Sequence, residues 1–227
     1  MNDNKIDLGI WNCPRSWKEL TLKQYQEIER YYADKTNEQV DVREIMHILF
    51  NKTQDEIDAL PIDVFERLLR ELKWLSDKPQ FDEPRAYVYI NDVRYTVNVV
   101  EKLKAGEYIA VDTAIKADRH NYAAILAILC RREGEIYDSK FENEVLPSRI
   151  EMFEKVPVVD VMPIVNFFLQ LWMVSVQLSQ LSSMAKEAIN LTQQSIESLS
   201  KNGVLQRLYM KWLRTKLRRL TKSIDSI

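Results

Sequence analysis

Residues 86–97 decide the fold class, and they read Ala-Tyr-Val-Tyr-Ile-Asn-Asp-Val-Arg-Tyr-Thr-Val. Aromatic and β-branched residues flank Asn91-Asp92, a dipeptide that tolerates the positive φ angles of a two-residue hairpin turn. The stretch predicts a β-hairpin with strands over 86–90 and 93–97. Because a two-stranded ribbon is marginally stable alone, we expect it to pack on helices. The other patterns are helical, so the predicted fold class is mainly α with a small β-hairpin (α+β), a helical body followed by a long C-terminal helical arm.

On the N-terminal side of the hairpin, residues 17–78 are predicted to form a helical unit. Capping boxes begin at Thr21 and Thr53, where a Thr is followed three residues later by Gln or Glu. A related Asp-x-x-Glu pattern opens a helix at Asp41, and Pro61 suits the first turn of another. The buried face expected for that last helix consists of Phe65, Leu68, Leu69, Leu72 and Leu75. Residues 1–16 are predicted to be an extended arm with Trp11 as an anchor.

On the C-terminal side, residues 79–146 are predicted to hold the ribbon and a helix over 121–131, whereas the pattern over 99–118 is ambiguous. Residues 147–200 are interpreted as an apolar and then amphipathic helical region, with Pro163 starting or kinking its apolar helix. Its later apolar residues form a narrow seam suited to one partner helix. These seam residues are Val174, Leu178, Leu181, Ala185, Ala188 and Leu191.

The most apolar stretch, residues 156–178, contains Asp160 and several other polar residues and prolines. A bilayer span needs about 20 mostly apolar residues, and a central carboxylate opposes insertion. We therefore expect a buried or partner-covered helix and no membrane partner. The N-terminus lacks the basic and apolar regions of a signal peptide.

The composition and motifs argue against an enzyme. Only four glycines are present, which disfavours Gly-rich phosphate loops and doubly wound nucleotide folds. No nucleophile elbow, metalloprotease motif or phosphate loop occurs. We predict no catalytic residues, no metal ligands and no cofactor. His47 is expected to be packed in a helix, and the acidic cluster Asp55, Glu56 and Asp58 is explained by local capping.

Two further features have ordinary explanations. Cys13 and Cys130 show no metal-binding spacing, and two cysteines in 227 residues fit free thiols in a reducing compartment. The tyrosines of the ribbon are compatible with an edge for strand addition. However, tyrosines are common on half-buried sheets, which is the favoured interpretation of Tyr87, Tyr89 and Tyr95.

The charge distribution is strongly asymmetric. Residues 201–227 hold eight basic residues and one acidic residue, a net charge of +7, whereas the first 200 residues hold 24 basic and 33 acidic residues, a net charge of −9. Apolar residues recur at helical spacing in the same segment, which predicts a basic amphipathic C-terminal helix over 201–227. Protein, nucleic acid, a membrane surface and a merely solvated face are all compatible with it. The candidate partner-binding residues are Arg207, Lys211, Arg214, Arg218, Arg219, Lys222 and Trp212.

Several phrases of the sequence suggest a family. They are WKELTLKQY over 17–25, IDALPID over 57–63, KAGEYIAVD over 104–112, AILAIL over 124–129, GEIYD over 134–138 and FFL over 167–169. Over roughly residues 17–175, the chain resembles small assembly and virion proteins of tailed phages of gut Bacteroidota. These are tail-assembly chaperones, or connector and ring proteins at the head–tail junction. The resemblance implies assembly without enzymatic activity and transfers no functional residues.

The polar helix and basic end exceed what a simple chaperone needs, so the leading hypothesis is a virion structural protein. It would form a ring at the portal–tail junction through protein–protein contacts with copies of itself, the portal and other tail proteins. Such a protein is made in the bacterial host cytoplasm and ends in the virion, in the tail or head–tail junction. The first alternative is a transient tail-assembly chaperone absent from the mature virion. The second is a DNA-binding module using the basic C-terminal helix.

Overall fold

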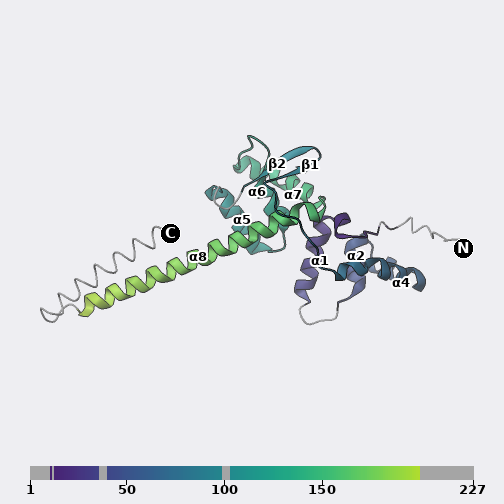
Figure 1. The fold of residues 1–227 in the computed structure, drawn as a ribbon, viewed down its shortest axis with the longest axis horizontal. Helices are drawn as coiled ribbons and strands as arrows, with labels where there is room; N and C mark the ends of the chain where they lie inside the picture. The colour runs from purple at the N-terminus through teal and green to yellow at the C-terminus, as the bar shows by residue number, and fades with distance from the viewer. Residues whose placement is uncertain (1–10, 12, 36–39, 99–102, 200–227) are drawn as a thin grey trace. The chain divides into compact units, whose positions relative to one another are not determined.

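The computed structural model describes residues 11, 13–35, 40–98 and 103–199. It is 66% helical with a small three-stranded antiparallel sheet, which confirms the predicted fold class (Figure 1). The chain divides into two units, residues 1–168 and 169–227. The predicted basic helix over 201–227 and residues 1–10 of the predicted arm lie outside the described residues.

Short helices form the N-terminal part of the first unit. They are the 3₁₀ turns η1 (Trp17–Glu19) and η2 (Leu72–Ser76) and the α-helices α1 (Leu22–Asp34), α2 (Val42–Phe50), α3 (Gln54–Asp58) and α4 (Ile62–Glu71). The capping boxes at Thr21 and Thr53 both form, as predicted. Asp41 caps α2 by accepting from the backbone N–H of Arg43 at 2.9 Å. Pro61 stands directly before α4 as its N-cap residue.

Two burial predictions for these helices are wrong. Leu69 is 37% exposed, because α4 buries a narrower face that is centred on Leu68. His47 is exposed rather than packed, and its Nδ1 contacts the backbone carbonyl of Lys52 just beyond the end of α2. Both residues lie at helix positions where the periodic pattern alone does not fix the width of the buried face.

The described end of the N-terminal arm is anchored by aromatic contacts. The Trp11 ring lies 5.1 Å from the Phe50 ring, between centroids, so Trp11 acts as the predicted anchor. Three residues later, the Pro14 carbonyl accepts a hydrogen bond from Nε1 of Trp74 at 2.9 Å. The root of the arm therefore packs on the helical N-terminal part of the unit.

The predicted hairpin is confirmed and gains a third strand. β1 (Tyr87–Ile90) pairs antiparallel with β2 (Val93–Val97), and β2 pairs with β3 (Cys130–Arg131) in the order β1-β2-β3. Asn91 and Asp92 have φ angles of 50° and 63°, as a type I′ turn requires. The helix predicted over 121–131 is too long, because Cys130 and Arg131 leave it to pair with β2.

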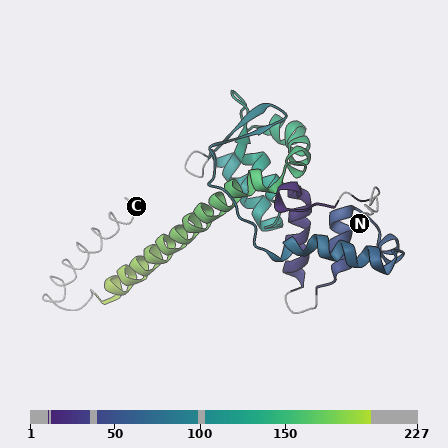
Figure 2. The same ribbon diagram turned by 45° about the vertical axis from the view of Figure 1, so that its right-hand side comes forward.

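The centre of the first unit is α6 (Tyr122–Leu129), whose eight residues are all buried. It packs against α1, against α5 (Ala105–Ala117) and against α7 (Leu146–Glu154), which follows a π-helical turn over Phe141–Val145. The region 99–118, ambiguous in the sequence, thus contains α5 in its described part. α8 (Val158–Leu199) is the last element of the described residues and forms one uninterrupted helix (Figure 2). It begins before Pro163, so this proline lies inside the helix and does not start it.

The turn geometry gives a direct test of stability. Asp92→Gly should stabilise the protein by about 0.5–1 kcal/mol, because glycine adopts positive φ without the steric cost that an L-residue carries. Asp92→Ala should destabilise it, since alanine keeps the Cβ and loses the short polar side chain. Urea unfolding measures both changes. Shifts in the same direction for the two variants would contradict this account of the turn.

Candidate functional site

The predicted partner-binding residues, from Arg207 to Lys222, all lie outside the described residues. The candidate surface on the described part of the chain is instead the exposed side of α8. This helix has 42 residues and is therefore about 63 Å long, at 1.5 Å per residue.

α8 carries two different apolar faces near its start. Val161, Val165 and Phe168 recur at helical spacing and are at most 3% exposed, so they belong to the core. Phe167, Leu171 and Val174 recur at the same spacing but are 42%, 38% and 52% exposed. The two series are offset by one residue at Phe167 and Phe168, which corresponds to about 100° around a helix. Folding thus buries one apolar face of α8 and leaves a second one at the surface.

The exposed face continues a regular sequence pattern, which we call the α8 seam. Its positions are Phe167, Leu171, Val174, Leu178, Leu181, Ala185 and Ala188. The successive spacings are 4, 3, 4, 3, 4 and 3, as in the heptad repeat of a coiled coil. No Asp, Glu, Lys or Arg occurs from 161 to 185, so this part of the helix presents no ionised side chain to water.

The same stretch meets simple length and hydropathy criteria for a membrane span. Among the described residues, only Val158–Gln177 is apolar and long enough to cross a bilayer. Of its 18-residue apolar part, 44% is buried within the structure. A core helix passes the same test, and Asp160 lies inside the stretch. Length and composition alone are therefore weak evidence for a bilayer here.

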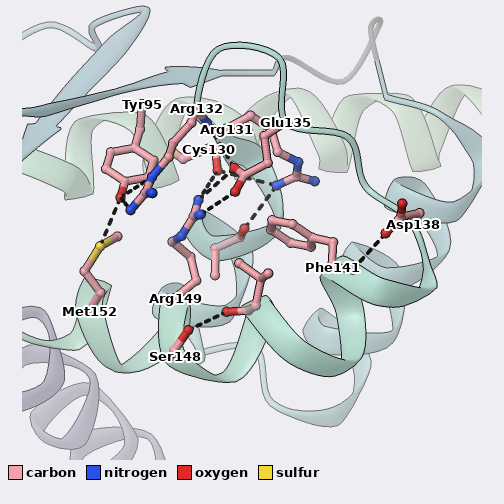
Figure 3. A network of polar contacts seen from close by, with 12 residues as sticks. Tyr95, Cys130, Arg131, Arg132, Glu135, Asp138, Phe141, Ser148, Arg149 and Met152 are labelled. Carbon is pink, nitrogen blue, oxygen red and sulfur yellow. Dashed lines mark hydrogen bonds and ion pairs between the residues drawn. The ribbon is translucent and has the colours of Figure 1, made fainter.

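A second distinctive cluster is a network of buried charged groups beside the sheet (Figure 3). Arg149 on α7 makes two hydrogen bonds to the Glu135 carboxylate, at 3.1 and 2.7 Å, and a third to the Cys130 carbonyl at 3.3 Å. Arg131 on β3 pairs with Glu107 on α5 at 3.0 Å, and both side chains are at most 6% exposed. The Arg131–Glu107 ion pair therefore joins β3 to α5, and Arg149 joins α7 to the Cys130 carbonyl of β3 and to Glu135 in the loop after it.

Aromatic rings pack on the two buried guanidinium groups of this network. The Arg131 guanidinium lies 4.5 Å from the centre of the Phe141 ring, and that of Arg149 lies 4.7 Å from the centre of the Tyr95 ring. The Tyr95 hydroxyl accepts hydrogen bonds from Arg132 at 2.9 and 3.1 Å. Burial acts to raise the pKa of Glu135, but the hydrogen bonds from Arg149 and the Arg132 backbone, together with the charges of Arg149 and Arg131, lower the pKa of this carboxyl overall. The Glu135 carboxyl is thus ionised at neutral pH.

The charged groups of this network join neighbouring elements of the fold, and the thiol beside them is not activated. Burial raises the pKa of the Cys130 thiol to about 12, so the thiol is protonated at neutral pH and is a poor nucleophile. Both cysteines are free thiols, as predicted. Within the described residues no group of three or more His, Cys, Asp or Glu side chains is placed to hold a metal ion.

Two further carboxylates of the described residues have structural roles. Asp118 accepts from the backbone N–H of His120 at 2.8 Å and from Arg30 Nε at 2.7 Å, so its carboxylate fixes a turn and an ion pair. Glu56 completes the capping box of α3, which confirms the capping explanation for this member of the acidic cluster.

Comparison with known proteins adds no family assignment. No protein-family description, curated protein or solved structure matches this chain.

The seam predicted from the sequence begins at Val174 and does not include Phe167 and Leu171. The missed signal is the spacing itself, since Leu171 lies three residues before Val174 and Phe167 four residues before Leu171. Both belong to the stretch that is expected to form a buried or partner-covered helix, because a sequence does not show which of two neighbouring apolar faces the body covers. The buried ion pairs were missed as well, and their partners are too far apart in the sequence to be recognised as pairs.

The buried pair Arg131–Glu107 predicts a large and reversible stability effect. Arg131→Met should destabilise the protein by about 3–5 kcal/mol, because it leaves the Glu107 carboxylate buried without its partner. Glu107→Leu combined with Arg131→Met should recover most of that loss, although Glu107 also accepts from the backbone N–H of Lys104 at 2.8 Å. Chemical unfolding measures both variants.

The control is Lys116→Met, which removes an ion pair to Asp112 in which the lysine side chain is 74% exposed. Exposed pairs contribute little, so its unfolding midpoint should stay close to that of the wild type. An Arg131→Met variant as stable as this control would show that the buried pair is dispensable.

Proposed function

We propose that this chain is a non-enzymatic structural protein of a tailed phage that assembles into a ring at the portal–tail junction. The observation that carries the assembly part of the proposal is the start of the α8 seam, where Phe167, Leu171 and Val174 remain exposed after the chain has folded. The resemblance of residues 17–175 to phage assembly and virion proteins supplies the phage context. The proposed partners are other copies of the chain, the portal and tail proteins.

The seam has the properties of a helix-packing interface. Its heptad spacing keeps one stripe facing a partner over three repeats, and Ala185 and Ala188 allow close approach of a second helix. Burying a Leu, Val or Phe side chain contributes roughly 1.5–3 kcal/mol. Phe167, Leu171 and Val174 are only partly exposed, so each would contribute part of that amount on assembly.

A ring requires contacts between two different faces of the same chain, related by a rotation that closes. The charge asymmetry of the sequence supports such a contact. The first 200 residues carry a net charge of −9 and residues 201–227 carry +7, so one copy offers complementary surfaces to the next. Electrostatic complementarity of this kind mainly fixes partner choice and register, while apolar burial supplies the affinity.

Substitutions on α8 test the assembly proposal. Leu171→Asp and Val174→Asp should each weaken the oligomer of the full-length protein by at least tenfold in dissociation constant, because each places a carboxylate in an apolar interface. Light scattering over a range of protein concentrations measures the oligomeric mass.

Met173→Asp is the matched control, since Met173 is 58% exposed on the same turn of α8 but lies off the seam. It should leave the oligomer intact. A wild-type protein that is monomeric at every concentration would contradict self-assembly and favour the transient chaperone, which would bind a different chain with the same face. Equal effects of all three substitutions would exclude the seam as the specific interface.

The basic end favours DNA binding as a second candidate function. In that case affinity for duplex DNA should fall about 10³-fold between 50 and 200 mM salt if six phosphates are contacted. Arg214→Glu with Arg218→Glu should weaken binding further, as measured by fluorescence anisotropy. The control carries the same charge change at exposed positions elsewhere, Lys18→Glu with Arg70→Glu. Equal losses for both double variants would show that overall charge, and not the C-terminal segment, governs binding.

A further inference from the structure

One edge of the sheet is open. The strand order is β1-β2-β3, so within the described part of the chain no strand pairs with the outer edge of β1. The Ala86 carbonyl accepts from the Val97 N–H at 3.0 Å, and Val88 and Ile90 are opposite Tyr95 and Val93. Because bonded and non-bonded pairs alternate in an antiparallel ladder, the N–H and C=O groups of Tyr87 and Tyr89 point away from β2.

Two hollows lie along this edge. One of about 490 Å³ is lined by Tyr89 to Asn91, by one side of α7, by the turn between α7 and α8, and by Asp160 of α8. The other, of about 170 Å³, is lined by residues 82–89 and by Val159, Asp160 and Pro163. They share Tyr89 and Asp160, and no β2 residue lines either one. The space is therefore beside the edge of β1 and not over the sheet.

The two faces of β1 differ in burial. Val88 and Ile90 are 6% and 8% exposed, whereas Tyr87 and Tyr89 are 39% and 61% exposed. A strand added at this edge would continue both faces, so it needs apolar side chains at every second position and polar or small ones between them.

The N-terminal arm has this pattern. Residues 5–10 read Lys-Ile-Asp-Leu-Gly-Ile, in which Ile6, Leu8 and Ile10 alternate with Lys5, Asp7 and Gly9. Six residues in extended conformation span about 20 Å, which is enough to cover the four residues of β1. The segment contains no proline, so every residue can donate to a ladder.

We propose that residues 5–10 of one copy add as a fourth strand to the open edge of β1 in a second copy. The inference rests on the proposed function and names one of its contacts. Ile6, Leu8 and Ile10 continue the buried face of Val88 and Ile90. Lys5 and Asp7 lie on the side of the exposed tyrosines. An arm that leaves one copy and pairs with the next is a head-to-tail contact, the type that a ring requires.

The position of the root of the arm favours a neighbouring copy over the same chain. Trp11, the residue directly after this segment, packs on Phe50 and not on the hairpin. Pro14 is held by Trp74, and none of these four residues lines either hollow. The residues at which the segment joins the body are therefore held at contacts that neither hollow includes.

Hydrogen exchange of the full-length protein tests the proposal at two amides. The N–H groups of Tyr87 and Tyr89 should be protected when the arm is added, and Leu8→Asp should abolish that protection. Asp7→Asn is the matched control on the opposite face of the arm and should keep it. The amides of Val88 and Ile90, which belong to the ladder with β2, serve as an internal reference and should stay protected in all variants.

A second pair of variants changes the edge itself. Tyr89→Pro removes an N–H that is not used by β2, as prolines do on edge strands, and should lower the oligomeric mass seen by light scattering. Tyr89→Ala removes the side chain but keeps the N–H, so the mass should be unchanged.

The outcomes separate this inference from the proposed function. An oligomer whose Tyr87 and Tyr89 amides exchange freely would overturn the strand addition and leave assembly through α8 standing. A monomer in which these amides are protected would show addition within one chain and overturn the contact between copies. A monomer with free exchange at both amides would overturn both proposals.

Discussion

The structure depends on one constraint, which is the complete burial of α6. A helix leaves four N–H groups and four carbonyls without partners at its ends, and water cannot reach them in a core. At the N-terminal end, the Ala123 N–H donates to the buried Gln26 side chain of α1 at 2.6 Å, and the Ala124 N–H donates to Asn121 at 3.1 Å. At the other end, the Ala127 carbonyl accepts from the Arg131 guanidinium at 3.1 Å.

These bonds order the elements around α6. The Leu129 carbonyl accepts from Asn98 at 2.9 Å, so the end of the helix is tied to the strand hairpin. Arg131 can bond α6 only because β3 follows the helix at once, and its charge then requires Glu107 of α5. The polar groups at the two ends of α6 therefore bind α1 and the sheet directly and α5 through Arg131. The buried Arg131–Glu107 ion pair follows from the need to give the Ala127 carbonyl a hydrogen-bond donor.

The parts of this architecture that are encoded locally could be predicted from the sequence. The capping boxes at Thr21 and Thr53 and the Asn91-Asp92 turn need only residues a few positions apart, and all of them form. The two-residue strand β3 has no periodicity of its own and exists because the edge of β2 lies beside it. Phe167 shows the same limit for the candidate surface, because its exposure depends on how much of α8 the body covers.

The two apolar faces of α8 also have a consequence for evolution. Val161, Val165 and Phe168 pack in the interior of the same chain, so substitutions there are restrained by folding. Phe167, Leu171 and Val174 are only partly buried, so substitutions there are restrained less by folding and more by the surface that they meet. Homologous chains should therefore keep the side chains of the first series nearly constant in size. The second series should change together with the surface of its partner, and it should differ most between lineages that use different partners.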